Sequence, residues 1–110
     1  MAGIVIARRW RARASEDGAR AYAAFFEETL VPQLDRIEGH RGALVMTRSE
    51  GGGVEITVLT FWDSMEAIAR FAADPERAVV EPEAQAVLEW FDDRVSHEQV
   101  ALDTRRGPAR

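Results

Sequence analysis

Hydrophobic residues recur along this chain with two different periods, which predict strands and helices in turn. Residues 4–13 begin with β-branched side chains and continue with basic residues alternating with apolar ones, a pattern typical of a strand. The next apolar residues recur at intervals of three and four, as on one face of a helix. They are Tyr22, Phe25, Phe26, Leu30, Leu34 and Ile37. Ser15 is a suitable N-cap for this helix, Pro32 predicts a kink in it, and Gly39 predicts its end.

The second half of the chain predicts a hairpin, short helices and a last strand. Residues 41–49 and 54–62 have strand patterns and are joined by a run of glycines, which permit the positive φ of a tight turn. The segment Asp63-Ser64-Met65-Glu66 is a capping box that begins a short helix. Two further short helices are expected to begin at Asp74-Pro75 and Glu81-Pro82, and a closing strand is expected over residues 94–102.

The resulting order is β-α-β-β-α-β, with the second helical region divided into pieces. This order predicts an α+β, ferredoxin-like fold, in which helices cover one face of a four-stranded antiparallel sheet. We predict one domain over residues 1–103. Residues 104–110 are polar, contain Gly107 and Pro108, and are expected to form a disordered tail.

The alternation along residues 54–62 assigns each side chain to one face of the sheet. Those expected to face the helices are Val54, Ile56, Val58, Thr60 and Trp62. Those expected on the opposite face are Leu59 and Phe61, with Leu44, Met46, Val5 and Val100 from neighbouring strands. Because an apolar face of this size is rarely left in water, we expect a second copy to cover it in a homodimer. The alternative is a monomer in which Glu55, Thr57 and flanking arginines solvate the face.

Composition excludes several classes of function. The chain has 110 residues, 46% hydrophobic and 30% charged, as is usual for a globular domain. A net charge of -5 argues against nucleic-acid binding, and the lack of Cys excludes thiolate chemistry and Cys-based metal sites. No apolar stretch approaches the roughly 20 residues needed to cross a membrane. The N-terminal order, apolar before basic, is the reverse of a signal peptide, so a cytoplasmic protein is expected.

Four segments resemble the antibiotic-biosynthesis-monooxygenase (ABM) family of dimeric α+β barrels. They are residues 6–13 (IARRWRAR), 39–43 (GHRGA), 59–68 (LTFWDSMEAI) and 95–100 (VSHEQV). The similarity covers about the whole chain except the tail, and residues 62–67 (WDSMEA) are its most distinctive part. The resemblance implies a homodimer with a pocket between sheet and helices in each subunit.

The resemblance also implies an activity. Some members oxidise anthrones or quinols with O2 and without metal or flavin, whereas others bind and degrade haem. The haem degraders use an Asn on the first strand, a Trp on the second helix and a His beyond it. At these positions this chain has Arg8 or Arg9, Phe71 and the region of Glu81. Because none of the three matches, cofactor-free oxidation is favoured over haem degradation.

His97 is the candidate catalytic base. Cofactor-free oxidation of a phenol or quinol begins with the removal of a proton, and a neutral imidazole near its ordinary pKa of about 6.5 suits this task. The competing interpretation is a structural His hydrogen-bonded to a carbonyl or carboxylate. His40 is expected to be an exposed loop residue, and two His without a carboxylate at helical spacing do not predict a metal site.

Four more residues are candidates for binding a substrate. Trp62 and Trp10 could each stack on a flat aromatic ligand, although core packing is the commoner role of such residues. Tyr22 could offer its hydroxyl from a position that otherwise indicates the core. Arg8 alternates with the inward residues of its strand, so its guanidinium would bind an anionic ligand or pair with a helix carboxylate such as Glu27 or Glu28.

The hypothesis that we place first is a cofactor-independent monooxygenase that acts on a small aromatic, quinol or polyketide-like molecule with O2. Neither a metal nor an organic cofactor is expected. The alternative is a non-catalytic barrel that binds a small hydrophobic ligand or acts in stress, because a pocket lined by aromatic residues binds without needing a base. Haem binding is the third interpretation.

Overall fold

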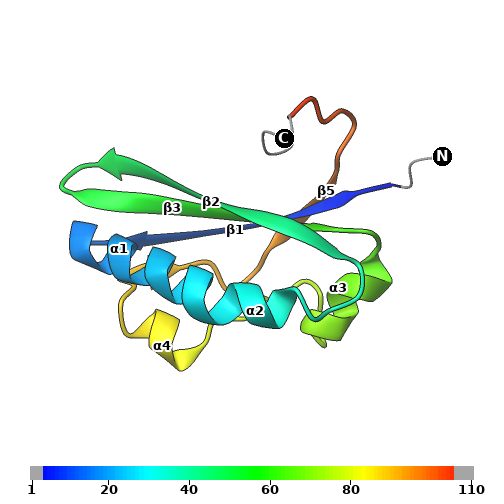
Figure 1. Ribbon diagram of the computed structural model, residues 1–110. Helices are drawn as coiled ribbons and strands as arrows, with labels where there is room; N and C mark the ends of the chain where they lie inside the picture. The colour runs from blue at the N-terminus through cyan, green and yellow to red at the C-terminus, as the bar shows by residue number, and fades with distance from the viewer. Residues whose placement is uncertain (1–3, 106–110) are drawn as a thin grey trace, which may run out of the picture.

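The computed structural model describes residues 4–105, in which helices cover one face of an antiparallel sheet (Figure 1). The central strand β1 (Ile6–Ala14) pairs along its whole length with β3 (Gly53–Trp62), and β2 (His40–Glu50) lies outside β3. The other edge of β1 pairs with β4 (Trp90–Phe91) at one end and with β5 (Ser96–Gln99) at the other. The predicted α+β, ferredoxin-like arrangement is therefore confirmed, with the last strand divided in two.

A long helical segment runs across one face of the sheet and changes its winding twice. It begins as α1 (Glu16–Phe25), continues as the π-helix η1 (Phe26–Leu30) and ends as α2 (Val31–Leu34). Ser15 caps it as predicted, because its hydroxyl accepts a hydrogen bond of 3.0 Å from the Gly18 N–H. The segment therefore starts where the sequence indicates but is not a uniform α-helix.

The predicted interruption at Pro32 takes the form of a wider turn. In η1 the Val31 N–H donates to the carbonyl of Phe26, five residues back, and Pro32, which has no N–H, follows directly. The expected helix end at Gly39 is wrong, because α2 already ends at Leu34. Gly39 has a φ of 97° and instead turns the chain into β2.

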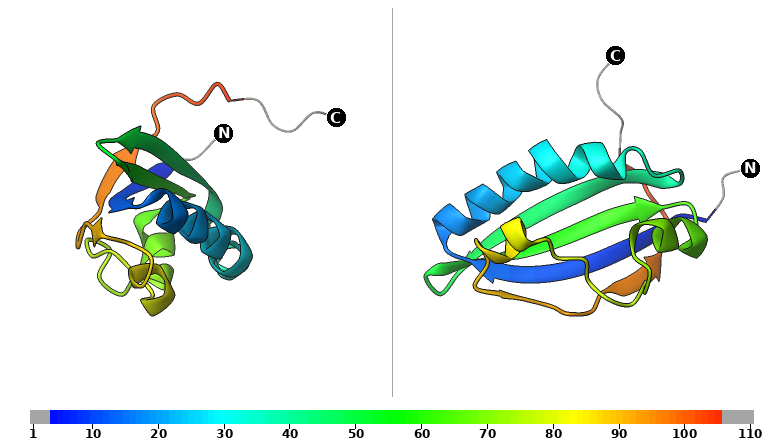
Figure 2. Two further views of the ribbon diagram at one scale, coloured as in Figure 1. Left: turned by 90° about the vertical axis from the view of Figure 1, so that its left-hand side faces the viewer. Right: turned by 90° about the horizontal axis from the view of Figure 1, so that it is seen from below.

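Two short helices lie on the same side of the sheet as the long segment (Figure 2). α3 (Met65–Phe71) begins within the predicted segment Asp63-Ser64-Met65-Glu66. The capping box itself is wrong, because Ser64 is the N-cap and the third helical residue is Ala67, whose N–H donates to the Ser64 hydroxyl at 3.1 Å. α4 (Pro82–Gln85) begins at its predicted proline. No helix among the described residues is long and apolar enough to cross a membrane.

The expected helix at Asp74-Pro75 is wrong. The Asp74 carboxylate instead closes a turn by accepting a hydrogen bond of 3.1 Å from the Glu76 N–H. The Glu76 carbonyl then accepts a hydrogen bond of 3.1 Å from the Val95 N–H, far along the chain. The Glu76 carbonyl, which in a helix would accept a hydrogen bond from a nearby N–H, is thus bonded to a distant part of the chain. The chain between β4 and β5 leaves the sheet edge to make this contact. The expected strand over residues 94–102 is therefore shortened to β5, and β4 is a strand that was not expected.

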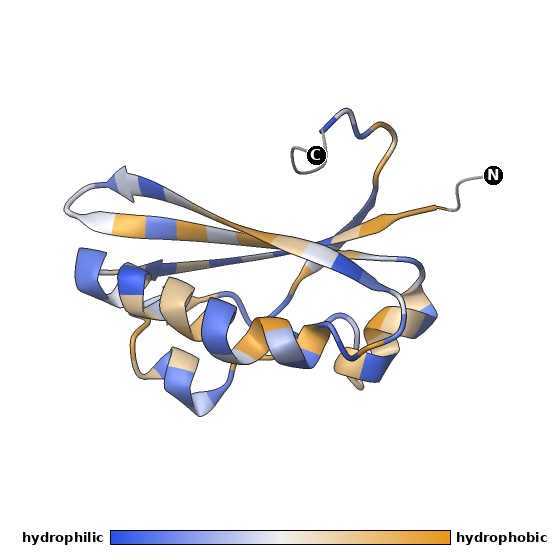
Figure 3. Cartoon of the chain, viewed as in Figure 1, coloured by the Kyte–Doolittle hydropathy of each residue, from blue (hydrophilic) through white to orange (hydrophobic). Residues whose placement is uncertain are grey.

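The face of the sheet that meets the helices forms the core. The inward residues of β3 are buried as predicted, and the alternation at the start of this strand is visible in Figure 3 as orange beside blue. They are Val54, Ile56, Val58, Thr60 and Trp62. Buried residues of the long helical segment and α3 pack against them, chiefly Tyr22, Phe26, Leu30, Leu34 and Ile68. Removing this apolar surface from water is the main stabilising term of such a fold.

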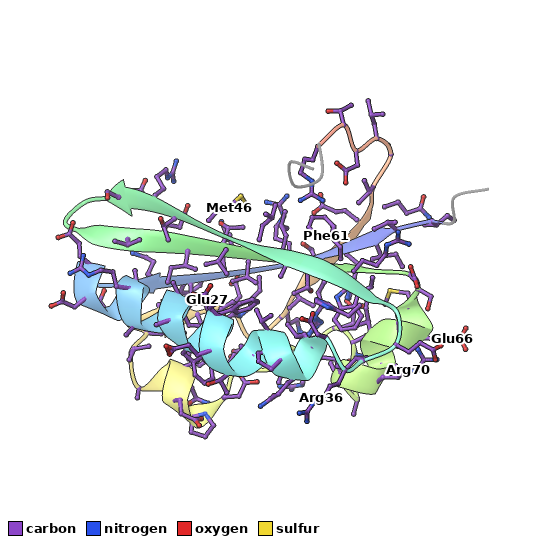
Figure 4. All side chains as sticks on the ribbon, viewed as in Figure 1. Glu27, Arg36, Met46, Phe61, Glu66 and Arg70 are labelled. Atoms are coloured by element: carbon purple, nitrogen blue, oxygen red, sulfur yellow. The ribbon has the colours of Figure 1, made fainter. Side chains whose placement is uncertain are left out.

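The opposite face of the sheet is uncovered in the single chain and has an apolar half on β2 and β3. Met46 is 41% exposed, and Leu44 lies opposite Leu59 in the strand register. Met46 and Phe61 are labelled on this side of the sheet in Figure 4. The guanidinium of Arg105 lies 4.7 Å from the centre of the Phe61 ring. Residues 106–110 of the predicted tail lie outside the described residues.

The other half of this face is ionic. Three arginines that alternate along β1 each pair with a carboxylate of the same chain. The pairs are Arg9 with Glu98 at 3.1 Å, Arg11 with Asp92 at 3.5 Å and Arg13 with Glu50 at 3.4 Å. All are partly exposed, so each contributes little to stability, of the order of 0–1 kcal/mol.

Gly39→Ala is expected to destabilise the protein more than the matched substitution Gly42→Ala. Both glycines have positive φ, 97° and 120°, so both substitutions strain the backbone. A Cβ on Gly39 would lie 2.5 Å from the Ala67 Cβ, whereas one on Gly42 would meet nothing within 4 Å. We expect Gly39→Ala to lower the free energy of unfolding by about 1–3 kcal/mol more, measured by urea denaturation. Equal losses would contradict the close approach of this turn to α3.

Candidate functional site

A cavity lies between the sheet and the helices. β1 and β3 contribute Arg8, Trp10, Val58 and Thr60, the long helical segment contributes Tyr22, Phe26, Leu30, Gln33 and Leu34, and later segments contribute Phe71, Ala78, Val79 and Val95. The lining is mostly aliphatic and aromatic, with a few polar groups, which is the usual character of a small-molecule site.

The cavity is small in this conformation. Its volume is about 50 Å³, enough for water molecules. An engineered cavity of about 150 Å³ is known to hold benzene, so an aromatic ligand requires the walls of this one to move. The irregular chain between α3 and α4, which contributes Ala78 and Val79, is the wall without regular secondary structure. Access is therefore expected on that side.

Arg8 is the charged residue of the cavity wall. Its side chain is directed inward from β1, as predicted, and the residue is only 4% exposed. Its Nη1 donates to the Pro75 carbonyl at 3.0 Å and its Nη2 to the Arg77 carbonyl at 2.7 Å. The guanidinium also lies 5.7 Å from the centre of the Phe71 ring. Arg8 thus fastens the irregular segment over the cavity.

The expected pairing of Arg8 with Glu27 or Glu28 is wrong. Both glutamates are exposed on η1, and backbone carbonyls take their place as acceptors. Burial lowers the pKa of Arg8, and the nearby charge of Glu76 partly opposes this effect. The guanidinium nevertheless remains protonated, because the ordinary pKa of an arginine lies far above neutrality.

Trp10 and Tyr22 form an aromatic wall beside Arg8, in the positions predicted for ligand contacts. Their ring centres are 5.7 Å apart, and the Trp10 Nε1 donates to the Asp92 carbonyl at 2.8 Å. Tyr22 is 3% exposed, and its burial, with the charge of Glu81 as the lesser cause, raises the pKa of its hydroxyl. That hydroxyl therefore keeps its proton and can act as a hydrogen-bond donor.

His97 lies next to this site but is not part of the cavity wall. It is opposite Arg8 in the pairing of β5 with β1, and its Nδ1 is 3.5 Å from a carboxylate oxygen of Glu76. Its Nε2 is buried without a hydrogen-bond partner among the described residues. Burial and the charge of Arg8 lower the pKa of His97, and Glu76 opposes them. The imidazole is thus neutral near pH 7, as a base must be.

Trp62 does not line the cavity, so it has the core role that is commoner for such residues and not that of a ligand contact. It is fully buried in the core, at 0% exposure, with its ring centre 5.9 Å from that of Phe71. Its Nε1 donates to the Thr60 hydroxyl at 2.8 Å. Because Thr60 does line the cavity, Trp62 acts on the site indirectly, by orienting that hydroxyl.

His40 is not the exposed loop residue that was expected. It begins β2, its side chain is 3% exposed, and its ring packs edge-on against Trp62 with centres 5.0 Å apart. Its Nδ1 is 3.5 Å from a carboxylate oxygen of Asp35. Burial lowers the pKa of His40 more than Asp35 raises it. Among the described residues, no cluster of three or more His, Asp or Glu side chains could hold a metal ion.

Sequence reasoning missed two contributors to the site. The sequence analysis considered Phe71 only as the residue at the position of the Trp that haem degraders use. Its place near the end of a helix with an apolar face could have indicated that it faces the sheet. The carbonyls of Pro75 and Arg77 had no signal, since every residue carries a carbonyl and only the fold selects these two.

The fold has clear relatives among solved structures. A comparison of the sequence with protein-family models gives no match, and neither does a comparison with curated proteins. A protein of Bordetella bronchiseptica, provisionally named an antibiotic biosynthesis monooxygenase, shares 20% identity over 90% of this chain and 99% of its own, with a TM-score of 0.60. Rv0793 of Mycobacterium tuberculosis shares 16% identity over 94% and 99% of the two chains, with a TM-score of 0.53.

A third structure contains a ligand. The monooxygenase from the ActVA-Orf6 gene of Streptomyces coelicolor, in complex with nanaomycin D, shares 12% identity over 97% of this chain and 93% of its own, with a TM-score of 0.56. At these identities the likeness concerns the fold. It confirms the fold that the resemblance of the sequence predicted.

The two histidines are expected to make stability depend on pH. Because the pKa of each is lowered in the folded state, the unfolded chain binds more protons just below the ordinary value of 6.5. Their contribution is therefore complete above pH 6.5 and is lost as the pH falls towards the lowered folded-state values. His40→Gln should reduce this loss, measured by urea denaturation over a series of pH values. An unchanged pH dependence in the variant would argue against a buried, neutral His40.

Proposed function

We propose that this chain, whose fold is that of proteins named antibiotic biosynthesis monooxygenases, is a cofactor-independent monooxygenase of a small aromatic or quinol-like molecule. The observation that carries the proposal is the cavity in which the aromatic wall of Trp10 and Tyr22 meets the buried cation of Arg8. An aromatic surface binds a flat ring, and a cation stabilises the negative charge that develops when the ring system is deprotonated.

The reaction that suits this arrangement is the oxidation of an acidic CH₂ group between aromatic rings. Loss of a proton gives an electron-rich anion, which transfers one electron to O2 to give a radical and superoxide. These combine to a peroxide anion, which takes up a proton to give a hydroperoxide. The hydroperoxide then loses water to leave a carbonyl group. One oxygen atom thus enters the product and the other leaves as water, so the substrate itself supplies all the electrons.

We assign the removal of the proton to His97. Its imidazole is neutral near pH 7, and its buried Nε2 has no partner among the described residues. His97 is the cross-strand neighbour of Arg8 and does not line the cavity. A ligand in the cavity therefore reaches His97 only when the segment around Glu76 moves aside. This segment belongs to the irregular chain between α3 and α4. The same chain has to move if the cavity is to become large enough for an aromatic ligand.

The alternative function is ligand binding without catalysis. The observation that favours it is the position of His97, since a base outside the cavity wall cannot touch a bound molecule in this conformation. The same aromatic wall and the same cation would then hold a ligand whose chemistry takes place elsewhere. Oxygen consumption separates the two functions. Haem binding has no observation in its favour.

We also propose that the functional unit is a homodimer formed through the uncovered face of the sheet. The support is the apolar half of that face, where Leu44, Met46, Leu59 and Phe61 are partly exposed. The ionic half is compatible with burial against a second copy, because each arginine of β1 already has a carboxylate partner. A two-fold axis would place the apolar halves of both copies in contact.

Purified protein supplied with an anthrone or a hydroquinone is expected to consume O2 above the uncatalysed rate, with one carbonyl formed for each O2 when the substrate is an anthrone. His97→Gln should lower kcat by about 10²–10⁴ through loss of the base. An oxygen electrode with chromatography of the product measures both quantities. His40→Gln is the matched control, because His40 is also a buried, neutral imidazole but lies away from the cavity.

Two results would count against these assignments separately. No O2 consumption above background with any of the substrates would remove the monooxygenase proposal and leave the binding function. Turnover that is unchanged in His97→Gln would keep the oxygenase but remove His97 as its base.

Leu44→Asp is expected to convert a dimer into monomers, because it would place a carboxylate in the apolar half, where its cross-strand neighbour is Leu59 and not a cation. Size-exclusion chromatography with light scattering at micromolar concentration measures the mass. Met65→Asp is the control, since Met65 is also an exposed hydrophobic residue, 39% exposed, but lies on α3. A monomeric wild-type protein would refute the homodimer.

A further inference from the structure

Arg8 carries a buried charge that no carboxylate in contact neutralises. The residue is 4% exposed, and its two hydrogen bonds are to the uncharged carbonyls of Pro75 and Arg77. No carboxylate of the described residues lies within 4.0 Å of its nitrogen atoms. Glu76, whose charge acts on Arg8 without this contact, instead approaches His97 at 3.5 Å. A buried charge without a counter-ion is costly, which makes the place beside it favourable for an anion.

No other residue of the cavity wall neutralises the charge of Arg8. The residues that line the cavity include no Asp and no Glu. His97 beside Arg8 is neutral near pH 7, so it adds no positive charge and supplies no negative charge either. Two of the five N–H donors of the guanidinium are used by the two carbonyls, and the others remain for a further acceptor. Among the described residues that line the cavity, Arg8 therefore carries the one charged side chain.

From this we infer that the cavity selects ligands that bind as anions: aromatic molecules with an ionised hydroxyl or carboxyl group placed against Arg8. The inference rests on the proposed function in that it takes this cavity as the ligand site. It adds that the ligand is charged before any reaction takes place, and that Arg8 is the residue that determines this specificity.

The aromatic wall adds a second polar group to the site. Tyr22 keeps its proton, and its ring adjoins Trp10, which stands two residues after Arg8 on β1. Its hydroxyl is therefore a hydrogen-bond donor from a residue of the same aromatic wall. A carbonyl or other acceptor on the ring is the complement to it.

The test compares two ligands that have the same ring and differ in charge. Isothermal titration calorimetry of the wild-type protein with naphthoate and with naphthamide at neutral pH is expected to give tighter binding of the anion by about tenfold or more. Arg8→Met should abolish this preference and Arg8→Lys should retain part of it. Arg9→Met is the matched control, because Arg9 lies on the same strand but on the uncovered face and should leave the preference unchanged.

A measurement on the wild-type protein alone keeps the inference testable if Arg8→Met does not fold. A nitrophenol bound in the cavity should have a lowered pKa, seen as a larger phenolate absorbance than in free solution at the same pH. Equal or tighter binding of naphthamide, a bound nitrophenol that is less ionised than the free one, or no binding of either naphthyl ligand would overturn the inference.

The outcome can be separated from that of the monooxygenase proposal. Preference for the anion without O2 consumption supports the inference and refutes the oxygenase. Consumption of O2 with a substrate that binds better in its uncharged form supports the oxygenase. It overturns the inference that Arg8 selects anions.

Discussion

A guanidinium buried under an irregular segment is the interaction on which the cavity depends. Arg8 holds the carbonyls of Pro75 and Arg77, and this contact keeps the chain between α3 and α4 against the sheet even though that chain has no helix of its own at this point. The bond between Val95 and Glu76 fixes the same segment from the other side. The wall of the site is thus held by polar contacts, which can exchange partners, and not by close apolar packing.

The central strand carries arginines on both faces, and each face satisfies them differently. On the uncovered face Arg9, Arg11 and Arg13 have carboxylates from three separate parts of the chain. On the inner face Arg8 has only backbone acceptors in direct contact and keeps its charge in a buried place beside the cavity. The same side-chain type therefore forms exposed ion pairs on one side and a buried charge without a contacting carboxylate on the other.

The order of elements followed from the sequence because it depends on local patterns. Alternation on β3 fixed its inner and outer residues, and the caps at Ser15 and Ser64 fixed where two helices begin. The turn at Asp74-Pro75 could not be predicted from the sequence. An Asp before a Pro can begin a helix, but it can also close a turn when tertiary hydrogen bonds are available.

The site was only partly predictable for a related reason. The inward direction of Arg8, and Trp10 and Tyr22 as contributors, followed from periodicity. The partners of Arg8 and the burial of His40 did not, since both depend on chain segments that are distant in sequence. Trp10 and Trp62 lie on the same face of the sheet, but only Trp10 lines the cavity. The alternation of the sequence assigns a residue to a face and does not say which residues of that face reach the cavity.

The π-helical turn explains how one helical segment lines so much of the cavity. Four of its lining residues, Tyr22, Phe26, Leu30 and Leu34, are spaced four apart, and in a regular α-helix of 3.6 residues per turn each such step rotates the side chain by about 40°. The wider winding of η1 lowers the rotation per residue and cancels part of this drift. Winding η1 as a regular α-helix of the same length would turn Leu34 away from the cavity, so the pitch of this segment is itself a determinant of the site's shape.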